Sequence, residues 1–438
     1  MVDFNILLQN MTSLHILRSQ INNRLAHYEP LTWHNAPYAH AWIMAFLFMG
    51  YLTRRPYTHT ARLLFLPIVV SSTFWCTIQY RLENQRYGWY NWIRGLSALA
   101  ATAHTITFAV FPDGLLKTRE GSHVDRFNSV DHEPGRNDKA LRVQQQRSFL
   151  PACISDAVEV ALAVRGIGWK HGHGVHVPRP RRSSKRNSFL VSTVISVIRT
   201  YLFVDLIDSF LDTLPGMTLT SGSLYFPALP LGLRYLAATT LHVLAGLVII
   251  LGIEMWYDIA SLIGVGIFNH SPTSWPPFHD EPWRLGSLHE FWSKRWHQAL
   301  RHTFLVYGGY PGWWVAGDLG MLFGTFLASG LFHEIGFYLG GERIDPWVIV
   351  FFVAQPFGIL AEKVYQKYTG KRVDGISGAF MITIFVVALG QICTNSWLGR
   401  GMGGRVITPP ALSPARRVLL PYRRARGFTV GEWSDVSV

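Results

Sequence analysis

The chain has 438 residues, of which 49% are hydrophobic and 15% are charged, with a formal net charge of +13. The charged share lies well below the roughly 25% of an average soluble domain, which argues against a soluble multi-domain protein. The lysines and arginines fall mostly in short stretches between apolar runs, as juxtamembrane residues do. We therefore interpret the basic charge as a match for a membrane surface and not for nucleic acid. Three cysteines give no sign of a disulfide framework.

Long apolar runs dominate the sequence. A helix that crosses the hydrocarbon core of a bilayer needs about 20 largely apolar residues. Eight runs approach this length, which predicts an all-α, multi-pass membrane helix bundle of about eight spans: Ala39–Leu52, Ala61–Gln79, Trp92–Phe111, Phe189–Phe210, Leu231–Trp256, Trp313–Leu339, Trp347–Ala361 and Ile376–Leu398. A further half-span or re-entrant piece is expected at Ile259–Phe268.

The polar stretches divide the chain into segments. Residues 1–38 form an N-terminal segment, and residues 39–398 form the multi-span domain, which includes a long polar loop over 113–188. This loop is expected to contain an amphipathic helix near Ser155–Val164. Residues 399–438 are rich in glycine, proline and arginine without apolar periodicity, which predicts a basic, disordered tail.

Loop charges predict an orientation, because cytoplasmic connections accumulate lysine and arginine. With eight spans, most basic connections fall on one side, which should be cytosolic: Arg54 with Arg55, Arg179–Arg186, Lys294 with Arg295 and Arg301, and Lys363 with Lys367 and Lys371. The same count places the basic tail on the opposite side, in conflict with this rule.

A histidine lies near the end of one of the longest apolar runs, in the stretch FLASGLFHEIGFY. At about 100° per residue, Gly320, Gly324 and Ala328 share one helix face, where small side chains let another helix approach closely. His333 falls roughly opposite. It could be a hydrogen-bonding partner in helix packing, or it could face an internal chamber, as ionisable groups at membrane depth often do.

A buried imidazole is favoured in its neutral form, which can take the proton from a hydroxyl that attacks an electrophile. This makes His333 the candidate general base. Its neighbour Glu334 lies about 100° away around the helix and is a weaker candidate. A metalloprotease is excluded, because the H-E-x-x-H pattern would require a histidine at Phe337.

The stretch FWSKRWHQALR follows a polar region that is unusually rich in aromatic residues. If it is helical, Trp292 and Trp296 are one turn apart, as in an amphipathic helix at the membrane interface. Alternatively, the stretch binds a phosphorylated cytosolic donor. In that case the phosphates would contact the nearby cations, Lys294, Arg295 and Arg301. His297 would then hydrogen-bond the reacting carbonyl.

Two further patterns are weak. Gly399, Gly401 and Gly404 match G-x-G-x-x-G, but they follow an apolar span and not a strand, so a dinucleotide site is not expected. The tract HGHGVH, from His171 to His176, is interpreted as part of a polar loop and not as a metal site. We expect neither a metal nor a bound cofactor.

Several blocks together resemble the wax synthase-like branch of the membrane-bound O-acyltransferase superfamily. WPPF at Trp275–Phe278, FWSKRWHQ at Phe291–Gln298 and SGLFHE at Ser329–Glu334 carry the resemblance. RGIGW at Arg165–Trp169 and YLFVDLID at Tyr201–Asp208 resemble further blocks of its fungal members. The similarity extends over about residues 30 to 400.

This resemblance implies a multi-helix fold around a reaction chamber. An acyl-CoA donor, acetyl-CoA in the first instance, would enter from the cytosol as a co-substrate, and a lipophilic alcohol would enter from the membrane lipid. His333 matches the superfamily's membrane-embedded catalytic histidine, and His297 matches the position of a second functional residue. The expected substrate-binding residues lie beside them: Trp292, Lys294, Arg295, Trp296, Arg301, Ser329 and Glu334.

The expected activity is therefore O-acetylation of a terpenoid or related lipophilic secondary metabolite, in a multi-pass protein of the endoplasmic reticulum. The first alternative is synthesis of wax esters from a fatty acyl-CoA and a long-chain alcohol. A second alternative is a proton-coupled transporter that uses His333 and Glu334 as a relay. An assembly or scaffold protein would depend on neither histidine.

Overall fold

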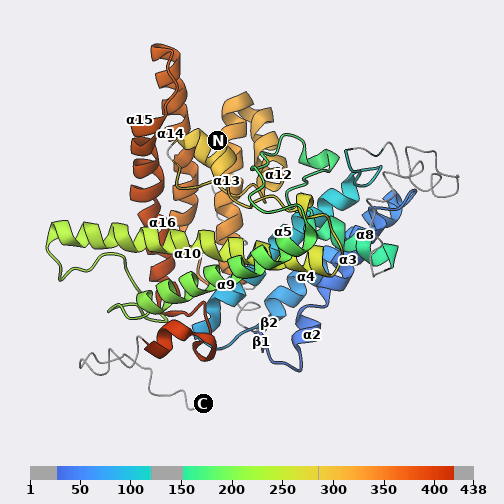
Figure 1. Cartoon of the computed structure of the whole chain (residues 1–438), viewed down its shortest axis with the longest axis horizontal. Helices are drawn as coiled ribbons and strands as arrows, with labels where there is room; N and C mark the ends of the chain where they lie inside the picture. The colour runs from blue at the N-terminus through green and yellow to red at the C-terminus, as the bar shows by residue number, and fades with distance from the viewer. Residues whose placement is uncertain (1–26, 119, 121–150, 285, 419–438) are drawn as a thin grey trace, which may run out of the picture.

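The computed structural model describes residues 27–118, 120, 151–284 and 286–418 (Figure 1). Within these residues the chain is almost entirely helical, which confirms the predicted all-α fold. The described strands are two short segments, β1 (Glu29–Pro30) and β2 (Tyr80–Arg81), which pair in parallel. This pairing ties the end of the N-terminal segment to the connection between two helices.

The α-helices, in chain order, are α2 (Ala36–Ala39), α3 (Trp42–Leu52), α4 (His59–Gln79), α5 (Gly88–Val110), α8 (Ala152–Leu162), α9 (Arg186–Leu211), α10 (Leu231–Gly266), α11 (Leu288–Glu290), α12 (Arg301–Phe304), α13 (Tyr310–Leu339), α14 (Pro346–Thr369), α15 (Gly375–Ile382) and α16 (Gly390–Gly399). Three π-helical turns lie between them, at Phe291–Arg295, Leu305–Gly309 and Thr383–Ala388. Short 3₁₀ turns cover Gln85–Tyr87, Lys170–Gly172, Pro272–Ser274, Met402–Gly404 and Pro410–Leu412.

Seven helical segments of the described chain are long and apolar enough to cross a bilayer. All eight predicted apolar runs correspond to helices, but the first, α3, has only 11 residues. The separate half-span expected at Ile259–Phe268 is wrong, because α10 continues through most of it as one helix of 36 residues. The amphipathic helix expected near Ser155–Val164 is confirmed by α8.

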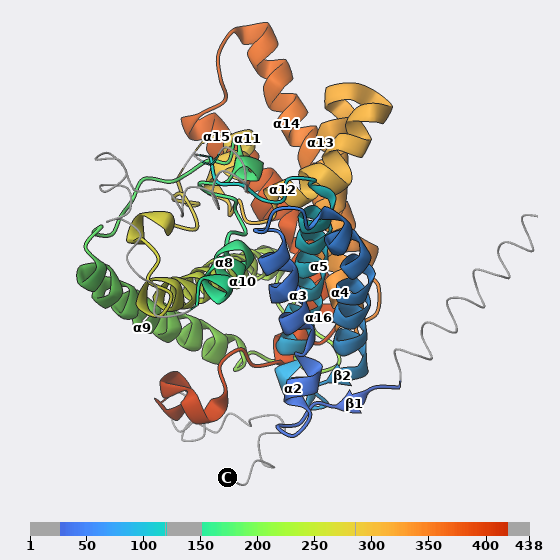
Figure 2. The same cartoon turned by 90° about the vertical axis from the view of Figure 1, so that its right-hand side faces the viewer.

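The helices form groups that cross at large angles. In Figure 1, α9 and α10 run side by side across the upright group of α13, α14 and α16. Figure 2 shows α3, α4 and α5 packed together on one side of the molecule, with α8 against α3. The expected site residues from Trp292 to Arg301 extend from just after α11 to the start of α12, and Ser329, His333 and Glu334 lie in α13.

The predicted span Trp313–Leu339 is not one straight helix. The chain reverses at Gly317, whose φ of 59° is in the left-handed region that glycine tolerates. The two arms pack glycine on glycine, with Gly308 against Gly324 and Gly312 against Gly320, where a Cβ atom on any of the four would clash with backbone. The predicted small-residue packing face is thus confirmed, although its partner is the preceding arm of the same hairpin.

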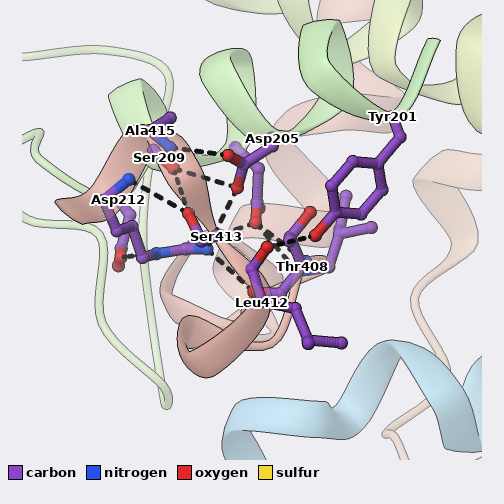
Figure 3. A network of polar contacts seen from close by, with 11 residues as sticks. Tyr201, Asp205, Ser209, Asp212, Thr408, Leu412, Ser413 and Ala415 are labelled. Atoms are coloured by element: carbon purple, nitrogen blue, oxygen red, sulfur yellow. Dashed lines mark hydrogen bonds and ion pairs between the residues drawn. The ribbon is translucent and has the colours of Figure 1, made fainter. Parts of the chain in front are cut away.

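The C-terminal segment docks on α9 through a polar network (Figure 3). The carboxylate of Asp205 accepts a hydrogen bond of 2.8 Å from the backbone N–H of Ala415. The hydroxyls of Ser209 and Ser413 lie 3.3 Å apart. Backbone and side-chain groups of the segment are therefore held by one face of α9.

Arg416 lies at the centre of this contact. Its guanidinium is 2.8 Å from the carboxylate of Asp208 and 3.3 Å from that of Asp212, and only 2% of the arginine is exposed. The expectation of a disordered tail is therefore wrong for residues 399–418, while residues 419–438 lie outside the described part. Sequence periodicity could not reveal this docking, because charge pairing and not an apolar stripe holds the segment.

Pairing of this kind bears on the conflict over loop charges. Three arginines at or beyond the end of α16 form ion pairs with acidic residues elsewhere in the chain: Arg400 with Glu334, Arg405 with Glu342 and Arg416 with Asp208. Paired charges do not act as free loop charges, so their side of the membrane need not follow the usual bias.

Candidate active site

His333 has a defined tautomer. Its Nδ1 atom lies 2.7 Å from the backbone carbonyl oxygen of Ser329, one turn earlier in α13. A carbonyl oxygen only accepts, so Nδ1 carries the hydrogen and Nε2 of the neutral ring keeps a free lone pair. The ring stacks on Phe352 of α14, with centroids 4.7 Å apart and planes inclined by 19°. This arrangement fixes the ring and leaves Nε2 as the basic atom.

His297 is presented by an irregular backbone. The stretch Phe291–Arg301 is not one α-helix: residues Phe291–Arg295 form a π-helical turn, and Trp296 is extended. The π-turn closes through the bond from the Trp296 N–H to the Phe291 carbonyl oxygen, at 2.8 Å. The extended residue swings His297 toward Phe278, and the two rings stack with centroids 5.7 Å apart.

The pKa of His297 depends on its burial and on nearby charges, among them that of His333. Burial lowers the pKa of His297 well below its usual value, and the neighbouring charges of His279, His333 and Arg165 lower it further. His333 is thus close enough to His297 for their charges to interact, and the lowered pKa keeps His297 neutral near pH 7.

One glutamine joins the histidine-bearing segment to α14, and a second glutamine closes the segment on itself. Gln355, which is fully buried, accepts a hydrogen bond of 3.1 Å from the Trp292 indole N–H. The side-chain amide of Gln298 donates to the carbonyl oxygens of Trp292 and Trp296, both at 3.1 Å. Both tryptophans are thus bonded into the interior of the protein and are not interfacial anchors alone.

Glu362 of α14 anchors the start of the same segment. Its carboxylate accepts hydrogen bonds from the backbone N–H groups of Leu288 (2.5 Å) and His289 (3.0 Å). Replacing Glu362 with alanine leaves both amides without these partners. Because an unsatisfied buried donor costs about 1–3 kcal/mol, we expect a lower melting temperature and a displaced His297.

The graded control is Glu362→Gln, whose amide oxygen can still accept from one of the two N–H groups. We expect its loss of melting temperature and of turnover to lie between those of wild type and Glu362→Ala. If the alanine variant matched wild type in both measurements, the anchoring role would be contradicted.

The predicted donor-binding cations have different environments. Arg295 is 8% exposed and is already paired with Glu290 at 2.6 Å and Asp280 at 3.4 Å, so its predicted role as a phosphate ligand is not supported. Lys294 is exposed. Burial is the main cause that lowers the pKa of His289, and the charges of Lys363 and Lys294 lower it further. Lys294 and Lys363, called the basic pair below, are thus two exposed cations near His289. Arg301 is half-buried at the start of α12.

Glu334 does not face the chamber as a substrate ligand. Its carboxylate is 3.0 Å from the guanidinium of Arg400 and accepts a hydrogen bond of 2.6 Å from the Asp345 N–H. Both charged side chains are almost fully buried. The prediction that Glu334 binds substrate is corrected to a structural ion pair, while Ser329 contributes through its carbonyl.

The sequence-based site omitted two residues beside His297. His279 is fully buried, with its ring centroid 6.0 Å from that of His297. Arg165 donates to the carbonyl oxygens of Pro276 and Pro277, both at 2.8 Å, and holds the loop that carries Phe278. Both residues belong to or follow sequence blocks described above, because Arg165 begins RGIGW and His279 follows WPPF. Neither block, however, indicates that its residue lies near His297.

Comparison with known proteins agrees with this geometry. The model of the membrane bound O-acyl transferase family matches residues 275–354. That range includes the Phe278 loop, the π-turn, both histidines and the start of α14. The matched residues thus include both predicted histidines and most of their contacts described above.

Three relatives extend the comparison. Acetyltransferase eriL of Hericium erinaceus is 23% identical over 47% of this chain and 55% of its own length. Acetyltransferase ple2 of Rhodocybe pseudopiperita is 27% identical over 68% of this chain and 76% of its own length. A protein of Arabidopsis thaliana named probable long-chain-alcohol O-fatty-acyltransferase 6 is 34% identical over 21% of this chain and 29% of its own length.

The chain spans about half the length of the Hericium relative that it matches. The matches nonetheless agree with each other and with the helical, membrane-spanning architecture. The chain is thus similar to the membrane-bound O-acyltransferase family, and in particular to its wax synthase-like members.

Proposed function

We propose that the protein transfers an acyl group, in the first instance acetyl, from acyl-CoA to a hydroxyl of a terpenoid or related lipophilic metabolite. The observation that carries the proposal is the free Nε2 of His333, fixed by the hydrogen bond from Nδ1–H to the Ser329 carbonyl oxygen. A general base requires such an unprotonated, oriented nitrogen. The names of the Hericium and Rhodocybe acetyltransferases favour acetyl as the group.

The proposed reaction is a direct transfer. Nε2 of His333 takes the proton of the acceptor hydroxyl while its oxygen attacks the thioester carbonyl carbon. The C–S bond then breaks, and the CoA thiolate takes the proton from His333. His297 polarises the thioester carbonyl from the other side. The products are an ester and free CoA, and the histidine returns to its starting state.

The donor is proposed to approach from the side of the basic pair. Lys294 and Lys363 lie near the outer end of the π-turn segment that carries His297. Ammonium groups at this point can contact the phosphates of CoA without being buried. The membrane concerned is proposed to be the endoplasmic reticulum, with this side facing the cytosol.

A donor comparison tests the proposal. Membranes containing the protein are incubated with labelled acetyl-CoA or palmitoyl-CoA and a mixture of hydroxylated terpenoids. We expect acetyl esters to form faster than palmitoyl esters, and we expect membranes without the protein to form neither. Failure to esterify any acceptor with either donor would contradict the proposed activity.

Wax ester synthesis is the second candidate, favoured by the local similarity to the Arabidopsis protein. It predicts the reverse preference, with palmitoyl-CoA and a long-chain primary alcohol as the better pair. The same incubation, supplemented with hexadecanol, decides between the two chemistries. A transporter based on a His333–Glu334 relay is disfavoured, because Arg400 already engages the Glu334 carboxylate.

A further inference from the structure

Two hollows meet on α9. The first is a cavity of about 540 Å³ between the start of α9, α10 and the loop Pro272–Phe278. The second, of about 440 Å³, is lined by Arg199 and five apolar residues of the outer face of α9: Ile195, Ile198, Leu202, Phe203 and Leu206. Ile195 and Arg199 line both hollows. An apolar groove on a spanning helix therefore leads directly into a cavity large enough for a small-molecule ligand.

Arg199 is an unusual residue at this junction. It lies 13 residues after the first residue of α9 (199 − 186) and 12 before the last (211 − 199). At 1.5 Å per residue this is roughly 20 Å along the helix from either end, in the middle of an apolar helix, and the side chain is exposed. Within residues 27–118, 120, 151–284 and 286–418, its guanidinium forms no hydrogen bond or ion pair. A cation in an apolar span is costly unless a ligand or a water-filled cavity compensates it.

The other arginines of the cavity are already engaged. Arg182 forms a bidentate pair with Asp258, at 2.6 and 2.7 Å, and Arg181 lies 3.8 Å from Glu281. Arg199 is thus the cation that is available to a ligand. Ser192 and Ser196 line the cavity on the same face of α9, at positions i−7 and i−3 from Arg199, and add hydroxyl groups to this polar stripe.

A single aromatic ring, that of Phe278, lies between the cavity and His297. Phe278 lines the cavity and stacks on His297 at 5.7 Å. Glu254 also lines it, and its carboxylate is 3.5 Å from Nδ1 of His279, the neighbour of His297. A ligand that enters from the lipid side thus meets a cation first and the histidine chamber last, with the acidic group of Glu254 at the chamber end.

We propose that this cavity binds the acceptor, and that the acceptor is a lipophilic hydroxy acid whose carboxylate is held by Arg199. This inference rests on the proposed acyl transfer. An apolar groove suits an amphiphile dissolved in the bilayer and not the polyanionic nucleotide of CoA. A guanidinium holds a carboxylate through two parallel hydrogen bonds, which fixes position as well as charge. The negative Glu254 at the opposite end orients the molecule with its hydroxyl end toward the histidines.

Matched acceptor pairs test this proposal. Purified protein is supplied with labelled acetyl-CoA and with oleanolic acid, ricinoleic acid or the methyl ester of each. We expect kcat/KM for at least one acid to exceed that for its ester by about tenfold or more, the scale of a hydrogen bond to a charged group. The Arg199→Gln variant should lose this preference, so that its kcat/KM values for the acid and for the methyl ester become similar.

The control is Arg179→Gln, which removes an exposed arginine from outside the cavity lining. It should keep the preference for the acid. Equal use of acid and ester by wild type, or an unchanged preference in Arg199→Gln, would overturn the proposal. A third outcome would also overturn the proposal: an anionic phospholipid co-purifies with wild type but not with Arg199→Gln, and the variant keeps the preference for the acid. Arg199 would then bind a lipid headgroup.

A binding measurement separates this inference from the proposed function. Tritiated ricinoleic acid is titrated into wild type and Arg199→Gln without acetyl-CoA. If wild type binds the acid at least about tenfold more tightly than the variant but esterifies nothing, the site stands and the acyl-transfer proposal fails. If wild type and Arg199→Gln bind ricinoleic acid equally tightly, the proposed carboxylate site is contradicted, whatever the outcome of the transfer assay.

Discussion

Replacing Arg400 with alanine is expected to be among the most destabilising single changes in the chain. The guanidinium of Arg400 lies 3.0 Å from the Glu334 carboxylate, and the two side chains are 0% and 3% exposed. Removing one partner of a buried pair leaves an uncompensated charge, at a typical cost of about 3–5 kcal/mol. We expect a large loss of melting temperature and of recovered monodisperse protein after detergent extraction.

Two variants make this expectation specific. Arg343→Ala removes an exposed arginine from the connection between α13 and α14 and should leave the melting temperature nearly unchanged. The double variant Arg400→Met with Glu334→Gln removes both charges and keeps an acceptor for the Asp345 N–H, so it should recover most of the loss. A double variant no more stable than Arg400→Ala would contradict the account of an uncompensated charge.

Replacing His333 with alanine is expected to abolish the chemical step while the protein remains folded. The ring touches Phe352 and makes its Nδ1 hydrogen bond within its own helix, so its removal changes little of the packing between helices. General-base assistance contributes about 10²–10⁴-fold to a rate. We expect kcat to fall by at least about 100-fold, with a melting temperature close to that of wild type.

The kinetic pattern distinguishes catalysis from binding. A lost base lowers kcat and leaves the Michaelis constant for acyl-CoA largely unchanged. The matched control is His34→Ala, an exposed histidine of the N-terminal segment, which should retain wild-type turnover. A variant His333→Ala that lost affinity for acyl-CoA but kept kcat would reassign the histidine from base to binding residue.

Local patterns in the sequence predicted much of this architecture. Apolar runs marked the spans because each needs only its own composition, and the glycine spacing before His333 correctly predicted a packing face. The assignment of His333 and His297 to one site came from the resemblance of their blocks to a family. In each case the decisive information lay within a short stretch of chain.

The remaining features depend on contacts that a local pattern does not contain. Arg400 meets Glu334 across 66 positions, and Arg416 meets Asp208 across 208. The helical segment ends in a π-turn at Phe291–Arg295, and Trp296 is extended, so helix faces drawn through Arg301 do not apply. Arg295 was predicted as a phosphate ligand from its place among nearby cations, although its charge is paired inside the protein.

Formation of labelled ester by the purified protein in lipid vesicles, from labelled acetyl-CoA and a hydroxylated terpenoid, tests the central claim most directly. The account predicts that wild type forms the ester and releases one CoA per ester, and that His333→Ala forms at least about 100-fold less in the same time. Equal ester formation by the two proteins would contradict the assignment of His333 as the base.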